Sequence, residues 1–548
     1  MVAAAAAASE VVAAAVAVSA EVVAAAEVSE AAEDGNQVKV KDKKVKEMKR
    51  TLLILALMMP LFIKAQGILD VYDFSTSFYQ GTAKSAAMGN AMGAVGQDFS
   101  AISINPAGLG LFRHSTFVFT PGLTIANTKS EFNGYDNSST EIRLPVNNIG
   151  AAVVFQKDDE ILKAVNFGIG MNRINNYTQE TFVSGLNTTS SLVDAYFIDM
   201  EANGITNADG LYSFSPNYIY PLWDTYVIGA SESNLYTTTV PAGYINQQRG
   251  LLKKGYTDEI SISLGFNLSD RWFIGASLDI PRLYRYTIND YKETNQSNNP
   301  AFNNFMFWMQ EEIISTNGWG VGGKFGLIGH PAKWLRLGLS FHTPTLYDIE
   351  ESWRTYTTAQ YRTDPDPSAS SHSTIKNYDT PTSIYKYKLT TPLRFDASAA
   401  FIFGNNGMIT FDYEFVNYSD ASLSCRDYDY SYVNRAIDDI FKATSNFRLG
   451  GEYRVKSVCF RAGYAFYGSP YGMSEKNFRT NNFSFGIGHT VHFFTIDAAY
   501  VYGRTPNSYY VYAPYSDQIP AADLENTNII DETKNMHQIV VSLKFKLD

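Results

Sequence analysis

The chain has 548 residues, of which 14% are aromatic and only 18% are charged, whereas charged residues make up about 25% of an average soluble domain. A formal net charge of −11 argues against nucleic acid as a partner, because phosphate binding needs clustered basic residues. Two cysteines exclude a disulfide scaffold and a four-thiolate zinc site. The mean hydropathy of −0.17 is too low for a bundle of transmembrane helices. This composition indicates a large β-protein with many half-apolar strands.

The N-terminal region divides into two parts by composition. Residues 1–47 are mainly Ala, Val and Glu with a lysine-rich end, so we expect a solvated or loosely helical extension. Residues 48–65 have a basic start, an apolar stretch and a small residue at Ala65, which is the pattern of a secretory signal peptide. We therefore expect translation to begin at Met48, residues 1–47 to be a start-site artefact, and the mature protein to begin near Gln66. The alternative is a genuine pre-sequence with an internal anchor.

Apolar and polar residues alternate from about residue 114 onward, in segments of about ten residues. In 260–268 the even-numbered residues are Ile, Leu or Phe, and the odd-numbered ones are Ser, Gly or Asn. The segments 393–401 and 447–455 follow a similar pattern. A period of two indicates strands with one apolar and one polar face, although a soluble β-sandwich would share it.

The lengths of the connections distinguish a soluble β-sandwich from a membrane-spanning β-barrel. Short links alternate with long polar segments, as in an outer-membrane β-barrel with short periplasmic turns and long outer loops. The short links are 269–271, 329–333, 404–407 and 456–457, and the long segments are 179–255, 291–316, 363–379, 424–444 and 507–534. We predict an all-β fold over 114–548: a 14-stranded antiparallel transmembrane barrel with strands beginning near 115, 146, 164, 257, 272, 318, 335, 384, 408, 445, 458, 481, 494 and 535. An even number of strands places both barrel ends in the periplasm.

Residues 66–113 do not alternate and are rich in small side chains. They contain Met88-Gly89, then Asp98-x-Ser100-Ala101, then the run Asn105-Pro106-Ala107-Gly108-Leu109. This stretch resembles the N-terminal hatch of the FadL/TodX family, whose members are fourteen-stranded outer-membrane channels for hydrophobic molecules. The resemblance covers most of 67–548, and the hatch motif is its specific part. It implies a plug inside the lumen, with Asn105, Pro106, Ala107 and Gly108 as a hatch or gate.

The resemblance also points to two further kinds of site. In the family, a kink in the third strand opens the wall sideways, and the third strand here carries three asparagines that would weaken regular pairing. We expect a lateral gate at Asn172, Asn175 and Asn176. Aromatic clusters in segments that should be polar loops are candidates for ligand capture: Tyr212, Phe214, Tyr218, Trp223, Phe305, Phe307 and Trp308.

Because successive side chains of a strand point to opposite faces, we expect four charged residues to face the lumen: Arg394, Asp412, Glu414 and Arg448. We expect a salt-bridged wall that fills the polar interior and binds the hatch; the alternative is that these residues orient a ligand carboxylate. No Ser/His/Asp arrangement or carboxylate pair has a readable spacing, so we predict no enzyme activity, no catalytic residue, no metal site and no cofactor. Cys425 and Cys459 lie on opposite sides of the membrane in this topology, and we expect free thiols.

The sequence therefore predicts an outer-membrane channel for passive uptake of hydrophobic small molecules, fatty-acid-like or aromatic. Uptake would proceed by loop capture, hatch movement and lateral exit into the outer-membrane lipid. The alternative is a PorV-like barrel of the same superfamily that does not transport but serves protein secretion, with a secreted protein as partner. A soluble β-sandwich lectin ranks last, because it needs neither a signal peptide nor the asymmetry of loops and turns.

Overall fold

The computed structural model describes residues 68–547 except 232–235, 367, 369–371, 472–477 and 512–528. The expected extension 1–47, the expected signal peptide 48–65 and the first two residues of the hatch lie outside the described residues. Within the described part, none of the helices has the length and apolar character needed to cross a bilayer.

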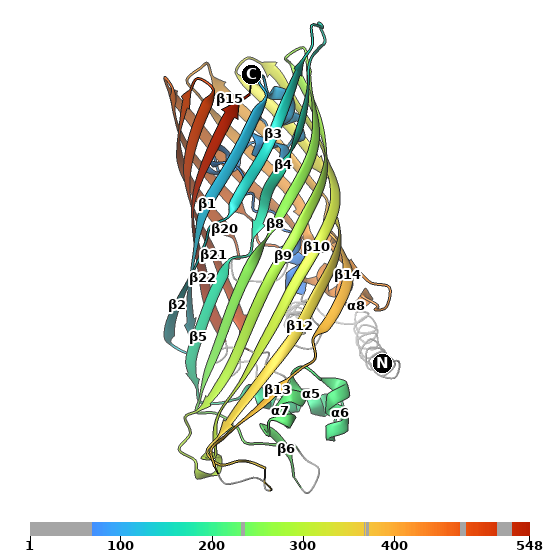
Figure 1. Cartoon of the computed structure of the whole chain (residues 1–548), viewed down its shortest axis with the longest axis vertical. Helices are drawn as coiled ribbons and strands as arrows, with labels where there is room; N and C mark the ends of the chain where they lie inside the picture. The colour runs from blue at the N-terminus through green and yellow to red at the C-terminus, as the bar shows by residue number, and fades with distance from the viewer. Residues whose placement is uncertain are drawn as a thin grey trace, which may run out of the picture.

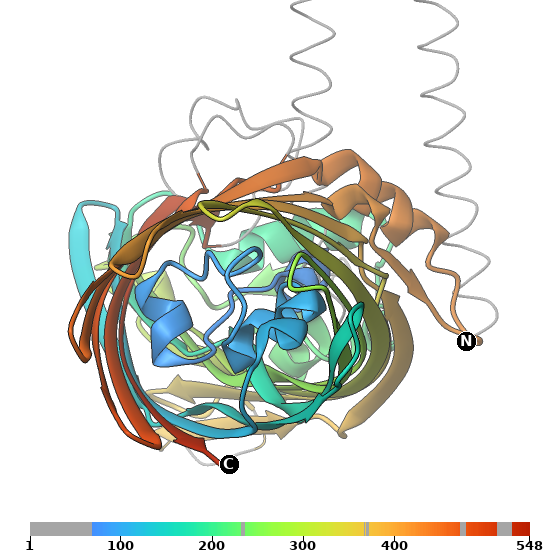
Figure 2. The same ribbon diagram turned by 90° about the horizontal axis from the view of Figure 1, so that it is seen from above.

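Fourteen antiparallel strands form a closed barrel (Figure 1, Figure 2). They are β1 (Thr116–Phe132), β3 (Val146–Gln156), β4 (Leu162–Asn176), β8 (Ile245–Leu268), β9 (Trp272–Asn295), β10 (Phe305–Ala332), β11 (Leu335–His342), β15 (Arg394–Phe403), β16 (Gly407–Asn417), β18 (Ala443–Val455), β19 (Val458–Tyr467), β20 (Thr480–Val491), β21 (Phe494–Tyr510) and β22 (Ile529–Lys546). Each pairs with the next, and β1 closes the ring by pairing with both β3 and β22. The predicted fold and number of strands are confirmed.

The remaining strands lengthen the wall or lie in the loops. They are β2 (Tyr135–Arg143), β5 (Gln179–Asn187), β6 (Ile228–Ala230), β7 (Tyr236–Thr238), β12 (Leu346–Tyr361), β13 (Thr374–Asp379), β14 (Ser383–Thr390) and β17 (Ser422–Ser424). The helices are α3 (Ile68–Ser75), α4 (Ala83–Ala87), η2 (Phe99–Ser103), η3 (Pro106–Leu111), α5 (Leu192–Ala202), α6 (Ala208–Phe214), α7 (Ile219–Asp224), η4 (Pro300–Phe302), η5 (Tyr418–Asp420) and α8 (Ser431–Ile440).

Prolines interrupt three of the long wall strands. Pro145 separates β2 from β3, Pro344 separates β11 from β12, and Pro392 separates β14 from β15. Proline cannot donate a ladder hydrogen bond, so each break changes the strand's neighbour. The strand predicted near 384 is therefore β14 followed by β15, and only β15 belongs to the closed ring.

The outer loops are shorter than predicted, because several wall strands continue far beyond the apolar alternation. Most of the segment 291–316 is strand, so Phe305, Phe307 and Trp308 lie on β10 and not in a loop. Within 179–255, β5 and the beginning of β8 occupy the two ends, and α5, α6 and α7 fill the middle. These helices cover the long-loop end of the barrel, which is the outer end by the usual orientation (Figure 1).

Alternate side chains of the strands face opposite sides of the wall, as predicted. Leu264 is 45% exposed on the outside, whereas its neighbour Ser263 is 1% exposed and faces the lumen. Other large apolar side chains follow the same outward rows, among them Ile262, Ile274 and Phe325. A closed barrel with an apolar outer surface satisfies every backbone group without water, so this wall is suited to span a bilayer.

Candidate functional site

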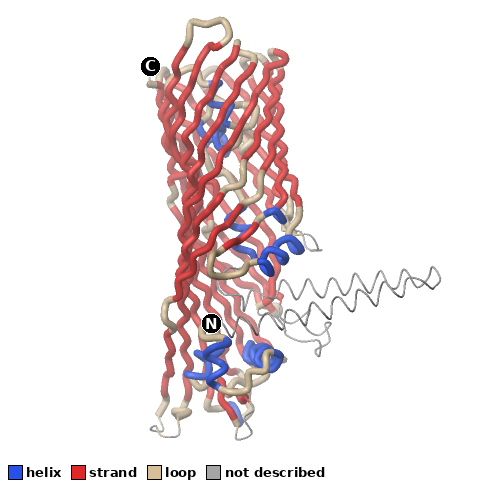
Figure 3. The backbone as a smooth tube through the Cα atoms, turned by 90° about the vertical axis from the view of Figure 1, so that its right-hand side faces the viewer, coloured by secondary structure: helices blue, strands red, loops and turns tan. Residues whose placement is uncertain are grey.

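Residues 68–112 lie inside the barrel, and α4, η2 and η3 occupy the end opposite to α5–α7 (Figure 2, Figure 3). Polar residues begin each of these short helices. The side chain of Thr82 accepts a hydrogen bond from the Ser85 N–H, that of Asp98 from the Ser100 N–H, and that of Asn105 from the Ala107 N–H. Such caps satisfy N–H groups that a short helix leaves free. The hatch therefore keeps its turns without a large core of its own.

Asn105 joins two parts of the hatch to the wall. Its Nδ2 donates to the Gly93 carbonyl at 2.8 Å and lies 3.4 and 3.3 Å from the carbonyls of Leu327 and Leu339. Its Oδ1 accepts from the Ala107 N–H at 3.1 Å. Asn105 is 1% exposed, and Ala107 is fully buried. These residues thus lie in the most tightly enclosed part of the hatch.

Further wall side chains bind hatch backbone all around the ring. Asn166 donates to the Leu109 carbonyl at 2.7 Å, Ser484 to the Ala87 carbonyl at 3.0 Å, and Arg336 to the Val95 carbonyl at 2.9 Å. Ser542, Ser340, His342 and Lys544 make similar contacts. Many hydrogen bonds therefore hold the hatch, with wall partners on β4, β11, β20 and β22.

Wall glycines allow the hatch backbone to touch the barrel directly. A Cβ atom at Gly275 would lie 2.3 Å from the Pro106 carbonyl group, and one at Gly450 would lie 2.5 Å from the Met88 carbonyl oxygen. Real Cβ contacts are almost never this short. Sequence reasoning missed these positions, although glycines on the lumen face of predicted strands are a readable signal of close backbone approach.

Gly450 and Gly451 provide a test of this contact. We expect Gly450→Ala to destabilise the protein by about 1–3 kcal/mol, because the added methyl group overpacks the hatch. Gly451 faces outward, where its nearest atom would lie 3.9 Å from a new Cβ, so Gly451→Ala should leave stability near that of the parent. Thermal unfolding of the two purified variants measures the difference. Equal melting temperatures would show that the hatch does not rest on this part of the wall.

A network of charged side chains on β15, β16 and β18 contacts the hatch. Arg394 and Arg448 both pair with the Glu414 carboxylate, Arg394 at 3.2 Å. Asp412 is fully buried, and its Oδ2 accepts from the Gly93 N–H at 2.9 Å. Arg394 also donates to the Ser75 carbonyl. All four residues that parity directs to the lumen are thus buried, and Arg394 and Asp412 contact the hatch backbone.

Helix α3 sits in the middle of the lumen on a second charged cluster. Arg285 on β9 has a side chain only 2% exposed, and it donates to both carboxylate oxygens of Asp70 at 2.5 and 2.6 Å. Lys253 lies 3.2 Å from the carboxylate of Asp73. Val71 and Phe74 of α3 belong to a buried apolar cluster, and the Arg285 guanidinium lies 4.5 Å from the centroid of the Phe74 ring. Sequence reasoning missed Arg285, because its partner lies 215 positions away along the chain.

The ladder between the second and third wall strands is incomplete. Its last pair is Asn148 with Asn172, and beyond this point, within the described part of the chain, β2 pairs only with β1 and β5 pairs only with β8. The register of β4 shifts between Arg173 and Asn175. Side-chain hydrogen bonds still link the two edges, such as Asn137 Nδ2 to the Ser184 carbonyl at 3.3 Å. The three asparagines of the predicted lateral gate lie at this interruption.

The hatch covers the interruption from inside. The Phe78 N–H donates to the Ile174 carbonyl at 2.7 Å, and the Gln80 N–H donates to the Arg173 carbonyl at 3.0 Å. Asn175 Nδ2 donates to the carbonyls of Asp73 and Thr76, at the end of α3. Asn172 donates to Ser103 Oγ at 2.8 Å, and Asn176 lies beside Thr124. The segment after α3 thus binds the backbone of β4 where β4 loses its neighbour.

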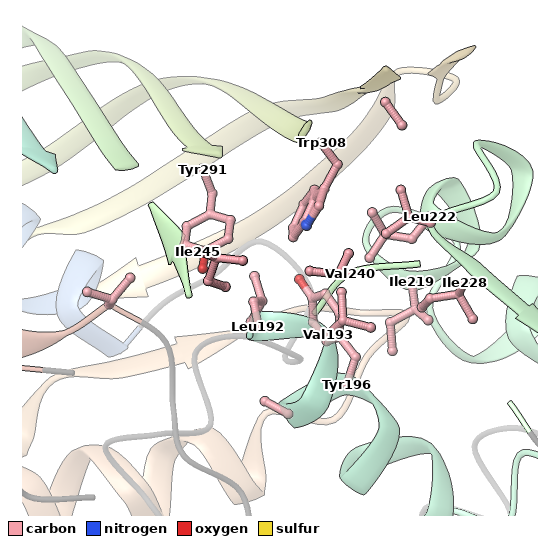
Figure 4. Packing of buried hydrophobic residues seen from close by; sticks show 14 of the residues in the cluster. Leu192, Val193, Tyr196, Ile219, Leu222, Ile228, Val240, Ile245, Tyr291 and Trp308 are labelled. Carbon is pink, nitrogen blue, oxygen red and sulfur yellow. The ribbon is translucent and has the colours of Figure 1, made fainter. Parts of the chain in front are cut away.

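The outer end holds a large apolar cluster between α5–α7 and the wall (Figure 4). Phe305 and Trp308 are buried in it, and Phe214, Tyr218 and Trp223 pack against it. Tyr218 donates to the Glu312 carboxylate, and burial together with that negative charge raises the pKa of Tyr218 well above its ordinary value. Of the other capture candidates, Tyr212 is 53% exposed and stacks edge-on against Tyr220, and Phe307 lies against Lys292.

The carboxylate of Glu293 fastens α5 to this cluster. It accepts from Ser191 Oγ at 2.6 Å and the Leu192 N–H at 2.8 Å, at the start of α5. It also accepts from Gln247, Tyr291 and Trp308. An acceptor at a helix N-terminus satisfies free N–H groups there. The outer end is thus closed by a packed cap that one buried acidic residue holds.

The fold and its interior define a class of protein: a closed antiparallel β-barrel with fourteen strands and an N-terminal hatch in its lumen. No protein-family model matches the sequence, and no curated protein matches it significantly. The hatch motif is the part of the sequence that resembles the FadL/TodX family.

Solved structures with a similar fold include a FadL homologue and two toluene transporters. A FadL homologue of Pseudomonas aeruginosa has 12% identity and a TM-score of 0.49, covering 86% of this chain and 100% of that one. The toluene transporter TodX of Pseudomonas putida has 14% identity, a TM-score of 0.48 and coverages of 86% and 100%. The toluene transporter TbuX of Ralstonia pickettii has 15% identity, a TM-score of 0.43 and coverages of 86% and 99%.

Proposed function

We propose that the protein takes up hydrophobic small molecules, fatty-acid-like or aromatic, by passive diffusion across the outer membrane. The observation that carries this proposal is the interrupted ladder beyond Asn148 and Asn172. A continuous wall would confine any solute to the lumen, whereas this interruption gives an apolar molecule a route into the bilayer. The names of the structural neighbours, which include toluene transporters, agree with this class of solute.

The hatch makes a sideways exit necessary. The bend from Asn105 to Gly108 fills the inner end of the lumen and is held by many wall contacts, so we assign to it the role of the closed end. Helix α3 and the segment 76–80 are the parts whose movement would free the interruption, because Asn175 and the β4 backbone bind them there. A ligand that binds where α3 lies would shift this equilibrium by its differential affinity for the two states.

Tying β2 to β5 tests the lateral exit. We expect a disulfide between Asn137→Cys and Ser184→Cys, made in a Cys425→Ser background, to slow uptake of a hydrophobic dye about tenfold or more, since a gate locked shut has no open state for the ligand to select. The matched control is Lys129→Cys with Ser138→Cys, a ladder pair within the β1–β2 hairpin that does not bridge the gap. Dye transfer into the bilayer of reconstituted vesicles is measured before and after reduction.

Equal rates for the oxidised and reduced forms would contradict the lateral exit. Purification of the parent with a bound secreted protein, and no dye transfer, would favour the secretion alternative. The extraction of a lipid-like molecule with the purified barrel, identified by mass spectrometry, would support transport.

A further inference from the structure

Helix α8 replaces strands in one side of the wall. It lies outside the ring of strands, between β17 and β18 in the chain (Figure 1, Figure 2). The ladder between β16 and β18 ends at Asn417 and Ala443. Beyond it, β17 makes three ladder pairs with β14 and, among the described residues, has no second strand neighbour. The outer half of the wall therefore lacks a continuous sheet here.

Two faces of α8 have opposite character. Val433, Ala436, Ile437 and Ile440 are buried, whereas its outer face carries exposed charged residues such as Arg435 and Asp438. Asn434 fastens the helix to β17, because its side chain accepts from the Leu423 N–H at 2.8 Å and donates to the Leu423 carbonyl at 2.9 Å. One amide side chain thus provides the two hydrogen bonds that a neighbouring strand would provide.

The buried face of α8 packs on a cluster of apolar side chains in the lumen, and we call the space that this cluster fills the chamber. The same cluster holds Val71 and Phe74 of α3, and wall side chains such as Leu283, Tyr347 and Leu389. Tyr72 of α3 lies 5.0 Å from Tyr418 between ring centroids, beside the base of α8. The ten-residue helix α8 therefore covers one side of this chamber.

The axial mouth, at the outer end of the barrel, is covered by three helices, α5–α7, and not by one. There the cap α5–α7 buries a large apolar cluster, and Glu293 fastens α5 with five donors from four elements of the chain. Opening the mouth would expose that whole cluster and remove two donors of the buried Glu293 carboxylate, those of Ser191 and Leu192, which is unfavourable. Lifting α8 would expose the four apolar side chains of its buried face and break the two hydrogen bonds of Asn434.

We propose that α8 covers a side entrance, and that the chamber now filled by Val71 and Phe74 is where an apolar small molecule is held after it passes beneath α8. The inference rests on the proposed transport function and adds to it the route and the binding chamber. An apolar solute would replace the apolar side chains of α3, so the chamber walls stay dry in both states.

A disulfide that fixes α8 tests the entrance. The variant is Leu423→Cys with Asn434→Cys in a Cys425→Ser background, and the probe is N-phenyl-1-naphthylamine added to vesicles that contain the full chain. We expect oxidation to slow probe uptake about tenfold or more and reduction to restore it, because a closed state that cannot open admits no ligand. The matched control is Lys388→Cys with Ser424→Cys, a ladder pair of β14 and β17 that leaves α8 free.

Two single substitutions give an independent measurement. Asn434→Ala removes the fastening of α8 and should raise the rate of uptake, whereas Glu293→Gln loosens the cap at the mouth and should not. Equal rates for the oxidised and reduced forms, or faster uptake with Glu293→Gln alone, would overturn the side entrance and leave the transport function intact. A parent protein that admits no probe would overturn the transport function and the entrance together.

Discussion

Replacing Leu264 with arginine is expected to destabilise the barrel by about 2–4 kcal/mol if this position lies near the middle of the bilayer. The Leu264 side chain points outward, and its ladder neighbours are Phe167 on β4 and Ala276 on β9. A guanidinium group there would replace an apolar contact with lipid by a charge in hydrocarbon. Unfolding of the refolded protein from detergent or lipid by a denaturant titration measures the loss.

Leu264→Met is the matched control, because it keeps an apolar side chain of similar volume at the same site. We expect it to cost less than about 1.5 kcal/mol. An arginine variant as stable as the methionine variant would contradict the outward assignment of this row of side chains. The whole parity of β8, and the lumen assignment of its odd-numbered residues, would then have to be reversed.

The barrel could be predicted from the sequence because the membrane imposes a simple rule on each strand. Residues such as Ile262 and Leu264 face lipid and must be apolar, while Ser261 and Ser263 face the lumen. Outside the bilayer, outward-facing side chains no longer have to be apolar. The outward row of β9 includes Arg282 and Asp290, so the alternation fades while the strand continues to Asn295. This is why segments predicted as loops are partly strand.

The contacts that organise the interior could not be predicted in the same way. Arg285 and Glu293 lie on one strand, but their partners are Asp70 and Ser191, more than a hundred positions away. Only the closing of the barrel brings them together. The asparagines of β4 were easier to find, because a cluster of turn-forming residues within a strand is a local signal.

Arg285→Met is expected to release α3 from the lumen. The substitution keeps much of the side-chain volume but leaves the carboxylate of Asp70 without its partner, and breaking a buried ion pair on one side costs about 3–5 kcal/mol. Because α3 is a single short helix, we expect it to leave its seat while the barrel stays folded. The segment 68–80 should then become accessible to protease, and uptake of a hydrophobic dye should rise.

Arg282→Met is the control, since Arg282 lies on the same strand but faces outward over the ring of Trp319 at 5.5 Å. It removes the same charge from the chain without touching α3, so protease access and uptake should stay at the parent level. If the Arg285→Met variant does not fold at all, the ion pair between Arg285 and Asp70 is needed for the barrel itself. If α3 stays protected and uptake is unchanged, apolar packing of Val71 and Phe74 alone holds the helix. In either case α3 would not be the movable part, and the freeing of the interrupted wall would have to begin elsewhere in the hatch.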